Sequence, residues 1–313
     1  MTKKHNSYPL DQSPFYKLQN RKKLCNLLIT TPKKLNSLLK RNDNYYEFDR
    51  VEKLGKVRRI EAPRKRLELL HHRIFILLAR IEVPNYLQSG TKGRSHITNA
   101  KKHIGNDELI SLDIKKFYPS TKGWHVYDFF HNVMKCSPDI AAILKDIAIY
   151  NDHVPTGSCL SQKIAFFAHY ELFNDIDKLS TEFNLTFTCF VDDINLSGKF
   201  ASKFHLNKVR VMLKHRGLQS HPKKERLYKK HQPKVVTGSI VTTLGLKLPN
   251  IKHYDIHAQI QENKELTDSK IKLKKLNSIK GKLVAGSQSD PSLAKNVRAV
   301  TCEINSLKKI VNK

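Results

Sequence analysis

Apolar residues recur at two spacings along the chain, and these spacings predict both strands and helices. Between residues 185 and 196 apolar and polar side chains alternate, which is the period-two pattern of a strand. Between Leu67 and Ile81 apolar residues recur at helical intervals, which predicts a helix that ends before Pro84. Strands and helices follow one another without strict alternation. The sequence therefore predicts the α+β class.

The same reading extends to the rest of the chain. Segment 47–63 is expected to form two strands around a turn at Gly55. A buried strand is expected over 108–120, ending at Pro119, and a loop from 153 is expected to lead into one long helix. Segment 90–105 is expected to be a loop between glycines that leads into a short helix. The remaining predicted elements are helices near 125–135, 139–150 and 201–215, short strands over 234–250, and helices from 251 onward, interrupted at 286–292.

Two adjacent aspartates, Asp192 and Asp193, interrupt the alternating pattern in the segment TCFVDDINLSG. Aspartate is a common turn residue, so a simple hairpin accounts for them. The strand before them is apolar enough to be buried, however, and adjacent carboxylates there repel each other unless a positive charge lies beside them. The pair is either an ordinary turn or part of a cation site.

A third carboxylate, Asp113, lies in a mostly apolar strand and needs a partner there. That partner is either a lysine, such as Lys115 on the same side of the strand, or a metal ion shared with Asp192 and Asp193. Three carboxylates without a histidine or cysteine set favour a hard cation such as Mg²⁺. Two such ions about 3.5–4 Å apart can activate an attacking hydroxyl and stabilise a leaving phosphate.

The charge of the chain narrows the choice of chemistry. Its 313 residues include 57 Lys and Arg against 28 Asp and Glu, a formal net charge of +29. Such an excess is typical of proteins that bind a polyanion, because each neutralised phosphate releases condensed counterions. In so basic a chain, a carboxylate-bound cation indicates phosphoryl or nucleotidyl transfer.

No membrane anchor or disulfide framework is expected. The longest apolar run, 74–79, is far too short to cross a bilayer, and the N-terminal segment lacks the apolar core of a signal peptide. Scattered cysteines without a C-x-x-C pair fit a reducing cytoplasm. The pair His71–His72 has no matching cluster, so we expect it at the surface and not at a metal.

Several segments resemble reverse transcriptase motifs and occur in the same order, over roughly residues 47–290. They are RRIEAPRKRLELLHHRI, TKGRSHITNAKKH, LDIKKFYPS, VPTGSCLSQ, FVDD, HPKKERLY and TLGLKLP. NAKKH at 99–103 and VTG at 236–238 resemble two elements of the bacterial retron reverse transcriptases. The resemblance implies a right-hand polymerase: fingers over 1–107, a palm over 108–250 with inserted fingers helices at about 122–152, and a short helical thumb over 251–313.

The resemblance also implies roles for individual residues. Asp113 and Asp192 match the main metal ligands, with Asp193 as a supporting carboxylate and the Ile114 carbonyl beside them, around two Mg²⁺ ions. Tyr118 matches the aromatic gate that excludes a ribose 2′-hydroxyl. The remaining residues with implied nucleotide contacts are Arg59, Lys65, Thr156, Gly157 and Lys224. Those with implied RNA contacts are Asn99, Lys101, Lys102, His103, Val236, Thr237 and Gly238, and the implied primer grip is Leu244, Gly245 and Leu246.

Two positions depart from the family pattern. The sequence reads Phe190-Val191 where the family usually has Tyr-Ala before the paired aspartates, so a hydroxyl is lost and a bulkier side chain is gained. It reads Thr156-Gly157 where the family usually has Gln-Gly. Threonine does not reach as far as glutamine toward a nucleotide. The three carboxylates themselves are intact.

The resemblance implies RNA-directed DNA synthesis on a dedicated structured non-coding RNA that serves as template and primer. It further implies a branched RNA–DNA product (msDNA), dNTP substrates, and a separate effector protein in antiphage defence. Two alternatives remain: another bacterial reverse transcriptase of the abortive-infection or group II intron type, and a non-catalytic RNA-binding scaffold in which the aspartates are dispensable.

Overall fold

The computed structural model describes residues 7–51, 55 and 57–311. Its named strands are β1 (Tyr45–Val51), β2 (Val57–Pro63), β3 (Glu108–Asp113), β4 (Thr186–Phe190), β5 (Asp193–Gly198), β6 (Arg226–Tyr228), β7 (Lys234–Val236), β8 (Ser239–Val241) and β9 (Leu246–Lys247). They form a hairpin β1-β2, a four-stranded sheet in the order β4-β5-β3-β6, and a three-stranded sheet β7-β8-β9. All of these pairings are antiparallel.

Helices pack around these sheets, and more residues lie in helices than in strands. They are α1 (Arg21–Leu27), α2 (Pro32–Leu39), α3 (Lys65–Ala79), α4 (His96–Lys101), α5 (Phe117–Ser120), α6 (Gly123–Asp128), α7 (Pro138–Ala148), α8 (Ser161–Ala168), α9 (Tyr170–Glu182), α10 (Lys203–His215), α11 (Asn250–Lys264), α12 (Ser269–Ser287) and α13 (Ala294–Val311). Separate helices and antiparallel sheets confirm the α+β prediction.

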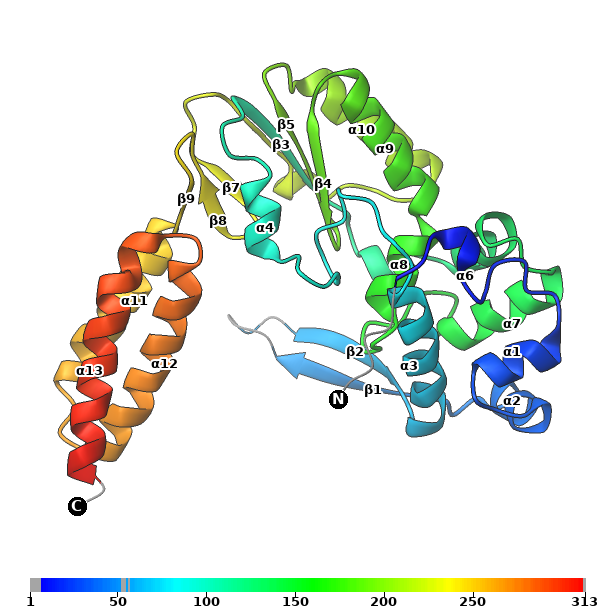
Figure 1. Ribbon diagram of the computed structural model, residues 1–313, viewed down its shortest axis with the longest axis horizontal. Helices are drawn as coiled ribbons and strands as arrows, with labels where there is room; N and C mark the ends of the chain where they lie inside the picture. Colours follow the sequence, from blue (N-terminus) through cyan, green and yellow to red (C-terminus); the bar gives the residue numbers. More distant parts are fainter. Residues whose placement is uncertain (1–6, 52–54, 56, 312–313) are drawn as a thin grey trace.

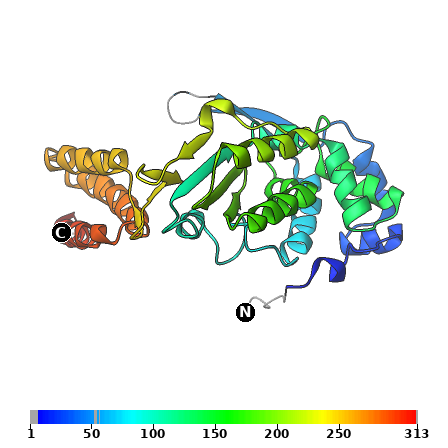
Figure 2. The same cartoon turned by 90° about the horizontal axis from the view of Figure 1, so that it is seen from above.

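The molecule is extended, with helices α11–α13 at one end and α1, α2 and α7 at the other (Figure 1). The view from above keeps the same separation (Figure 2). Helices α11–α13 enclose their own apolar cluster, which includes Leu276, Ile279 and Leu283. The larger cluster joins the N-terminal helices to the four-stranded sheet. The residue boundaries assigned to fingers, palm and thumb stay a prediction.

The four-stranded sheet positions the charged residues of interest. Its central strands β3 and β5 are apolar where they pair, with Ile110 opposite Leu196 and Leu112 opposite Ile194. These side chains are fully or almost fully buried, which fixes the register because a one-residue slip would turn them to the other face. The register places Asp113, the last residue of β3, directly opposite Asp193, the first residue of β5.

Two predicted elements end earlier than expected. Strand β3 stops at Asp113, because Lys116 turns the chain with a left-handed φ of 51° and Pro119 falls inside the short helix α5. Proline is tolerated there because the first turn of a helix leaves its N–H groups unpaired. The long helix predicted after residue 153 is broken at His169 into α8 and α9, where the buried imidazole Nε2 lies 3.1 Å from the Thr121 hydroxyl.

The prediction of a surface position for His71 is wrong. Its side chain is fully buried, with Nδ1 2.6 Å from the Ser158 hydroxyl and Nε2 2.6 Å from the Ile147 carbonyl oxygen. Burial lowers the pKa of His71 to about 4, so the imidazole is neutral and joins α3 to its neighbours. Helical spacing alone could not show which side of α3 is covered. Among the described residues, no helix is long and apolar enough to cross a membrane.

Candidate active site

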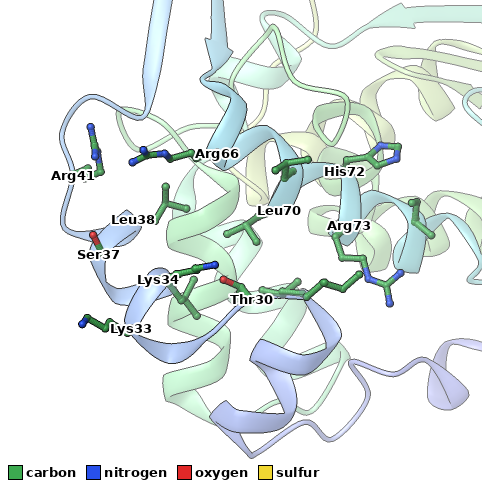
Figure 3. Close-up of a pocket in the computed structure, with 15 residues that line it drawn as sticks. Thr30, Lys33, Lys34, Ser37, Leu38, Arg41, Arg66, Leu70, His72 and Arg73 are labelled. Carbon is green, nitrogen blue, oxygen red and sulfur yellow. The ribbon is translucent and has the colours of Figure 1, made fainter.

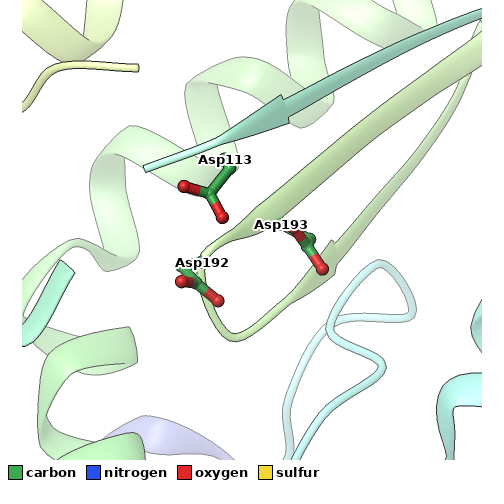
Figure 4. A group of neighbouring side chains, drawn as sticks. All are labelled: Asp113, Asp192 and Asp193. Atoms are coloured by element: carbon green, nitrogen blue, oxygen red, sulfur yellow. The ribbon is translucent and has the colours of Figure 1, made fainter. Parts of the chain in front are cut away.

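Three carboxylates meet at one end of the four-stranded sheet. Asp113 ends β3, Asp193 begins β5, and Asp192 lies in the turn between β4 and β5. One oxygen of each carboxylate lies within 4.8 Å of the others, and Figure 4 shows the three side chains side by side. The sequence prediction that these residues come together is correct. An all-oxygen set of this kind can hold a hard divalent cation.

The turn that carries Asp192 is held from both sides. The Ile114 N–H donates to the Asp192 carbonyl oxygen at 2.8 Å, and the Val191 N–H donates to the Ser89 hydroxyl at 2.9 Å. Val191 adopts a left-handed φ of 59°, which is costly for a β-branched residue. Strained backbone of this kind persists only where the surrounding structure enforces it, and it is often found at functional sites.

The carboxylates lack enough positive charge to balance them. Burial, followed by the charges of Asp192 and Asp113, raises the pKa of Asp193 to about 7. Burial also raises the pKa of Asp192, as does the charge of Asp113, whereas Lys224 and Arg58 oppose that rise. The Lys224 ammonium donates to Asp113 Oδ2 at 2.6 Å. The lysine partner predicted for Asp113 therefore exists, but it is Lys224 and not Lys115.

Tyr118 lies beside this group on α5. Burial and the charge of Asp192 raise the pKa of Tyr118 to about 12, and the Arg58 guanidinium opposes the rise. The phenol ring packs 5.8 Å from Phe117, centroid to centroid, and remains half-buried. The ring is therefore close enough to the carboxylates to border a substrate there. Its role as a sugar gate stays a prediction.

Arg59, whose predicted nucleotide contact stays a prediction, lies on the hairpin β1-β2 beside Arg58. Arg59 forms ion pairs with Glu47 at 2.6 Å and Asp49 at 3.3 Å, on strand β1. Arg58 acts on Asp192 and Tyr118 instead. Neighbouring residues of a strand point to opposite faces, so the two arginines cannot share one role. The alternation of side chains along β2 separates Arg58 from Arg59, and the position of the motif alone does not. Lys65 is exposed at the start of α3, and among the described residues it forms no ion pair with the carboxylates, so its nucleotide contact stays a prediction.

Thr156 and Gly157 hold the hairpin in place. The Thr156 hydroxyl accepts from the Glu61 N–H at 3.1 Å and donates to the Arg59 carbonyl oxygen at 3.2 Å. The Gly157 N–H donates to the Glu61 carbonyl oxygen at 2.8 Å. A Cβ atom at Gly157 would lie only 2.7 Å from that oxygen, so the close approach requires glycine. Both residues engage the backbone of β2, and their predicted nucleotide contact stays untested.

Asn99 and His103, for which RNA contacts were predicted, lie inside the fold. Both side chains are fully buried. His103 lies 2.6 Å from the Ser197 hydroxyl and 2.8 Å from the Thr188 hydroxyl, so it bridges β5 and β4. Asn99 Nδ2 donates to the Thr237 hydroxyl at 3.4 Å. These polar groups join elements of the fold, and in this conformation neither Asn99 nor His103 can contact RNA.

The NAKKH and VTG elements nevertheless lie together. Thr237, in the turn between β7 and β8, donates its hydroxyl to the His96 carbonyl oxygen at 2.7 Å. Val236 is buried in a small cluster with Ile97 and Ala100, so its predicted RNA contact is also excluded in this conformation. Lys101 and Lys102 are exposed, and Thr237 and Gly238 are half-buried. The exposed members of the two elements can still form one RNA surface.

The predicted primer grip is a tight turn before β9. The Thr242 hydroxyl donates to the Gly245 carbonyl oxygen at 2.8 Å, and Gly245 has a φ of 149° that favours glycine. Leu244 is 97% exposed at the tip, whereas Leu246 is buried at the start of β9. An apolar side chain held so far out of the fold is available to a partner; contact with a primer stays a prediction.

No protein-family model matches the chain. The chain is 33% identical to the retron Se72 reverse transcriptase of Salmonella heidelberg (strain 579083-10) over 172 residues, which cover 53% of this chain and 44% of that protein. It is 26% identical to the retron Ec86 reverse transcriptase of Escherichia coli over 234 residues, or 72% of each protein. It is 27% identical to the retron Mx65 reverse transcriptase of Myxococcus xanthus over 227 residues, or 65% of this chain and 52% of that protein.

The chain thus spans about half the length of two of these three relatives. Together they confirm the resemblance to retron reverse transcriptases that the motifs predicted. Among solved structures, the foamy viral protease-reverse transcriptase dRH in complex with double-stranded DNA aligns with 97% of this chain and 48% of that one, at 15% identity and a TM-score of 0.49.

Proposed function

We propose that this chain, a relative of the retron reverse transcriptases, is an RNA-directed DNA polymerase. The observation that carries the proposal is the group formed by Asp113, Asp192 and Asp193, whose oxygens converge within 4.8 Å. Burial and mutual repulsion raise the pKa values of Asp192 and Asp193, and Lys224 balances the group only in part. A divalent cation would relieve that repulsion.

In this proposal the three carboxylates hold two Mg²⁺ ions, with the Ile114 carbonyl beside them. When bound, such ions polarise the primer hydroxyl and stabilise charge on the leaving phosphate. The residues of the chain fix the geometry: the register of β3 and β5 sets the distance between Asp113 and Asp193, and the strained turn at Val191 aims Asp192 toward them.

The nucleotide would lie between the carboxylates and the hairpin β1-β2. Arg58 is the cation of that hairpin whose charge reaches the site, so we assign it the triphosphate contact first given to Arg59. Lys224 would move from Asp113 to a phosphate when cations bind, because it is 57% exposed and free to turn. Tyr118 would border the sugar and exclude a 2′-hydroxyl. Lys65 and the Thr156-Gly157 loop remain further candidates for nucleotide contact.

The template and product are proposed from the names of the relatives. They are retron reverse transcriptases, which supports a structured non-coding RNA as template and primer and a branched RNA–DNA product. Lys101, Lys102 and the turn at Thr237–Gly238 offer an exposed surface for that RNA, and Leu244 is placed to meet the primer. A separate effector and a role in antiphage defence, in the cytoplasm, belong to the same proposal.

Primer extension with the purified full chain tests the proposal. The substrate is a generic RNA template annealed to a DNA primer, with dNTPs and Mg²⁺. We expect template-dependent DNA synthesis that stops with EDTA and resumes when Mg²⁺ is added in excess. If the chain binds this RNA–DNA duplex tightly but adds no nucleotide with any divalent cation, the chain is a non-catalytic RNA-binding scaffold and not a polymerase. Sequencing of co-purified nucleic acid identifies the native RNA.

A further inference from the structure

A cleft lies between the loop after α1, the helix α2 and the helix α3 (Figure 3). Helix α2 lies at the end of the molecule away from α11–α13 (Figure 1). The volume of the cleft is about 940 Å³, in the upper part of the range found for binding pockets. It is separate from the candidate active site, since none of Asp113, Asp192 or Tyr118 lines it. Its basic lining residues are Lys33, Lys34, Arg41, Arg66, His72 and Arg73.

The charge of this cleft is one-sided. No aspartate or glutamate lines it. Arg41 is paired with Asp43 outside the cleft, at 2.8 Å, and Arg73 donates to the Leu27 carbonyl oxygen at 2.7 Å. Across residues 7–51, 55 and 57–311, no ion pair is recorded for Lys33, Lys34 or Arg66. The cleft therefore offers unpaired positive charge to an anionic ligand.

The middle of the cleft is apolar. Figure 3 shows Leu38 and Leu70 between Arg41 and Arg66 on one side and Arg73 on the other. Two further apolar lining residues remain in water, because Ile29 is 77% exposed and Leu69 is 64% exposed. An apolar centre with a charged rim is the arrangement found at protein interaction sites.

Ile29 is also placed against its own backbone preference. It follows the last turn of α1 with a left-handed φ of 55°, a position where glycine or asparagine is preferred and a β-branched residue is strained. An exposed isoleucine at such a position gains nothing from the fold. A ligand that covers Ile29 would explain both its exposed apolar surface and its strained backbone conformation.

We infer that this cleft is the docking site for an amphipathic segment of a partner protein that carries acidic residues beside its apolar ones. The apolar centre would bury leucine- or phenylalanine-like side chains, and Lys34 and Arg66 would pair with the flanking carboxylates. A nucleic-acid strand fits less well, because its phosphates would match the rim but would leave the apolar centre at Leu38 and Leu70 unmatched, and His72 is the one aromatic ring among the lining residues. The inference does not depend on polymerase activity.

A peptide selection against the full chain tests the chemistry of the ligand. The probe is a displayed library of helical peptides with apolar residues fixed at positions i, i+4 and i+7 and all other positions randomised. The protein is intensely basic, so acidic peptides can be retained anywhere on its surface. Each round is therefore counter-selected against the double variant Lys34→Glu/Arg66→Glu. We expect the surviving peptides to carry aspartate or glutamate beside the fixed apolar positions.

The consensus peptide is then measured against single variants by fluorescence anisotropy. Asparagine suits the left-handed backbone at position 29, so Ile29→Asn should raise or keep the melting temperature. The same variant should weaken peptide binding by about tenfold, which corresponds to about 1.4 kcal/mol. Arg66→Glu should weaken peptide binding at least as much. The matched control for Arg66→Glu is Lys203→Glu on α10, which changes the charge by the same two units elsewhere and should change the affinity by less than about twofold.

Three results would overturn the inference. If the surviving peptides carry no excess of aspartate or glutamate, the proposed pairing of Lys34 and Arg66 with carboxylates of the partner is wrong. Equal affinity for the wild type, Ile29→Asn and Arg66→Glu would place the peptide outside the cleft. A loss of affinity for a generic RNA hairpin in Ile29→Asn and Arg66→Glu, without any loss for the peptide, would assign the surface to RNA. Primer extension should be unchanged in Ile29→Asn, which separates this test from that of the proposed polymerase.

Discussion

Two groups of polar side chains lie at opposite ends of the same strands, β4 and β5. At one end Asp113, Asp192 and Asp193 converge with a single lysine contact. Toward the other end His103 joins Ser197 on β5 to Thr188 on β4, and both ring nitrogens have hydroxyl partners. Both groups look alike in sequence, since each consists of polar residues beside apolar runs.

The difference lies in what burial does to each group. Burial lowers the pKa of His103 to about 3, so the ring is neutral and its hydrogen bonds are complete within the protein. Burial raises the pKa of Asp193 to about 7, two more carboxylates lie beside it, and the positive charge of Lys224 offsets this rise only in part. Polar groups with matched partners stabilise a fold, whereas polar groups left in mutual conflict point to a missing ligand.

The largest effect is expected for Asp192→Asn. The amide keeps the size of the side chain and removes the charge that attracts a cation, so primer extension should fall by at least about 10²–10³. The unfolding temperature, measured without divalent cations, should stay the same or rise because a repulsion is removed. Near-normal synthesis by this variant would end the cation-site account and leave the aspartates as an ordinary turn.

His103→Ala should show the opposite pattern. Removing the ring leaves the buried Thr188 hydroxyl without its partner, whereas the Ser197 hydroxyl still accepts from the Asn106 amide at 2.7 Å. We expect a loss of about 1–3 kcal/mol in the free energy of unfolding. Synthesis per folded molecule should change little. Urea unfolding gives the stability, and Lys102→Ala is the control, since an exposed neighbour should change it by no more than about 0.5 kcal/mol. A His103→Ala protein as stable as the wild type would contradict the bridging role.

The pH dependence of stability separates the two groups by sign. The pKa of Asp193 rises from its ordinary value of 3.8 in the unfolded chain to about 7 in the folded one, so the folded state binds more protons between these values. Its contribution to stability therefore falls as the pH rises from about 4 to 7. His103 acts in reverse: its pKa drops from 6.5 to about 3 on folding, so stability falls as the pH is lowered through that window.

Asp193→Asn should remove the first of these slopes. With EDTA present, the variant should gain stability over the wild type as the pH rises toward 7 and above, by at least about 1 kcal/mol, the equivalent of one pKa unit. Chemical denaturation at closely spaced pH values measures the gain. A difference between variant and wild type that does not change with pH would show that Asp193 is not under this strain.

Thr237→Val is expected to give the smallest effect. It keeps the β-branched shape and removes the hydroxyl that donates to the His96 carbonyl oxygen and accepts from the Asn99 amide at a long 3.4 Å, which should cost about 1 kcal/mol. Urea unfolding measures that loss. If affinity for the native RNA falls much further than this loss explains, while a generic RNA–DNA duplex is still bound, Thr237 contacts RNA as well as α4.

The sequence predicted one of the two groups well. Acidic side chains after apolar strands led to the prediction that Asp113, Asp192 and Asp193 come together, the order of motifs located all three, and the structure brings them within 4.8 Å of one another. The motif resemblance placed Asn99 and His103 among the RNA contacts. It could not show that His103 is buried against β4 and β5, because that depends on strands formed more than eighty residues later.

Other features depend on tertiary packing in the same way. Arg58 and Arg59 are adjacent in sequence, and the pairing of β2 with β1 sets the face of the hairpin to which each side chain points. At the break between α8 and α9, His169 contacts Thr121, a residue that no local pattern around His169 contains. The class, the strands and the carboxylates follow from local chemistry; the side on which a residue is covered follows from tertiary packing.

Iron-directed cleavage tests the central claim most directly, namely that the three carboxylates jointly hold the divalent cation. Fe²⁺ replaces Mg²⁺ in a complex of the full chain with an RNA template, DNA primer and dNTP, and ascorbate with peroxide generates radicals at the bound ion. The account predicts backbone cuts near residues 113–114 and 191–193, which disappear with excess Mg²⁺ and in Asp192→Asn. Cuts confined to other parts of the chain, unaffected by Asp192→Asn, would contradict it.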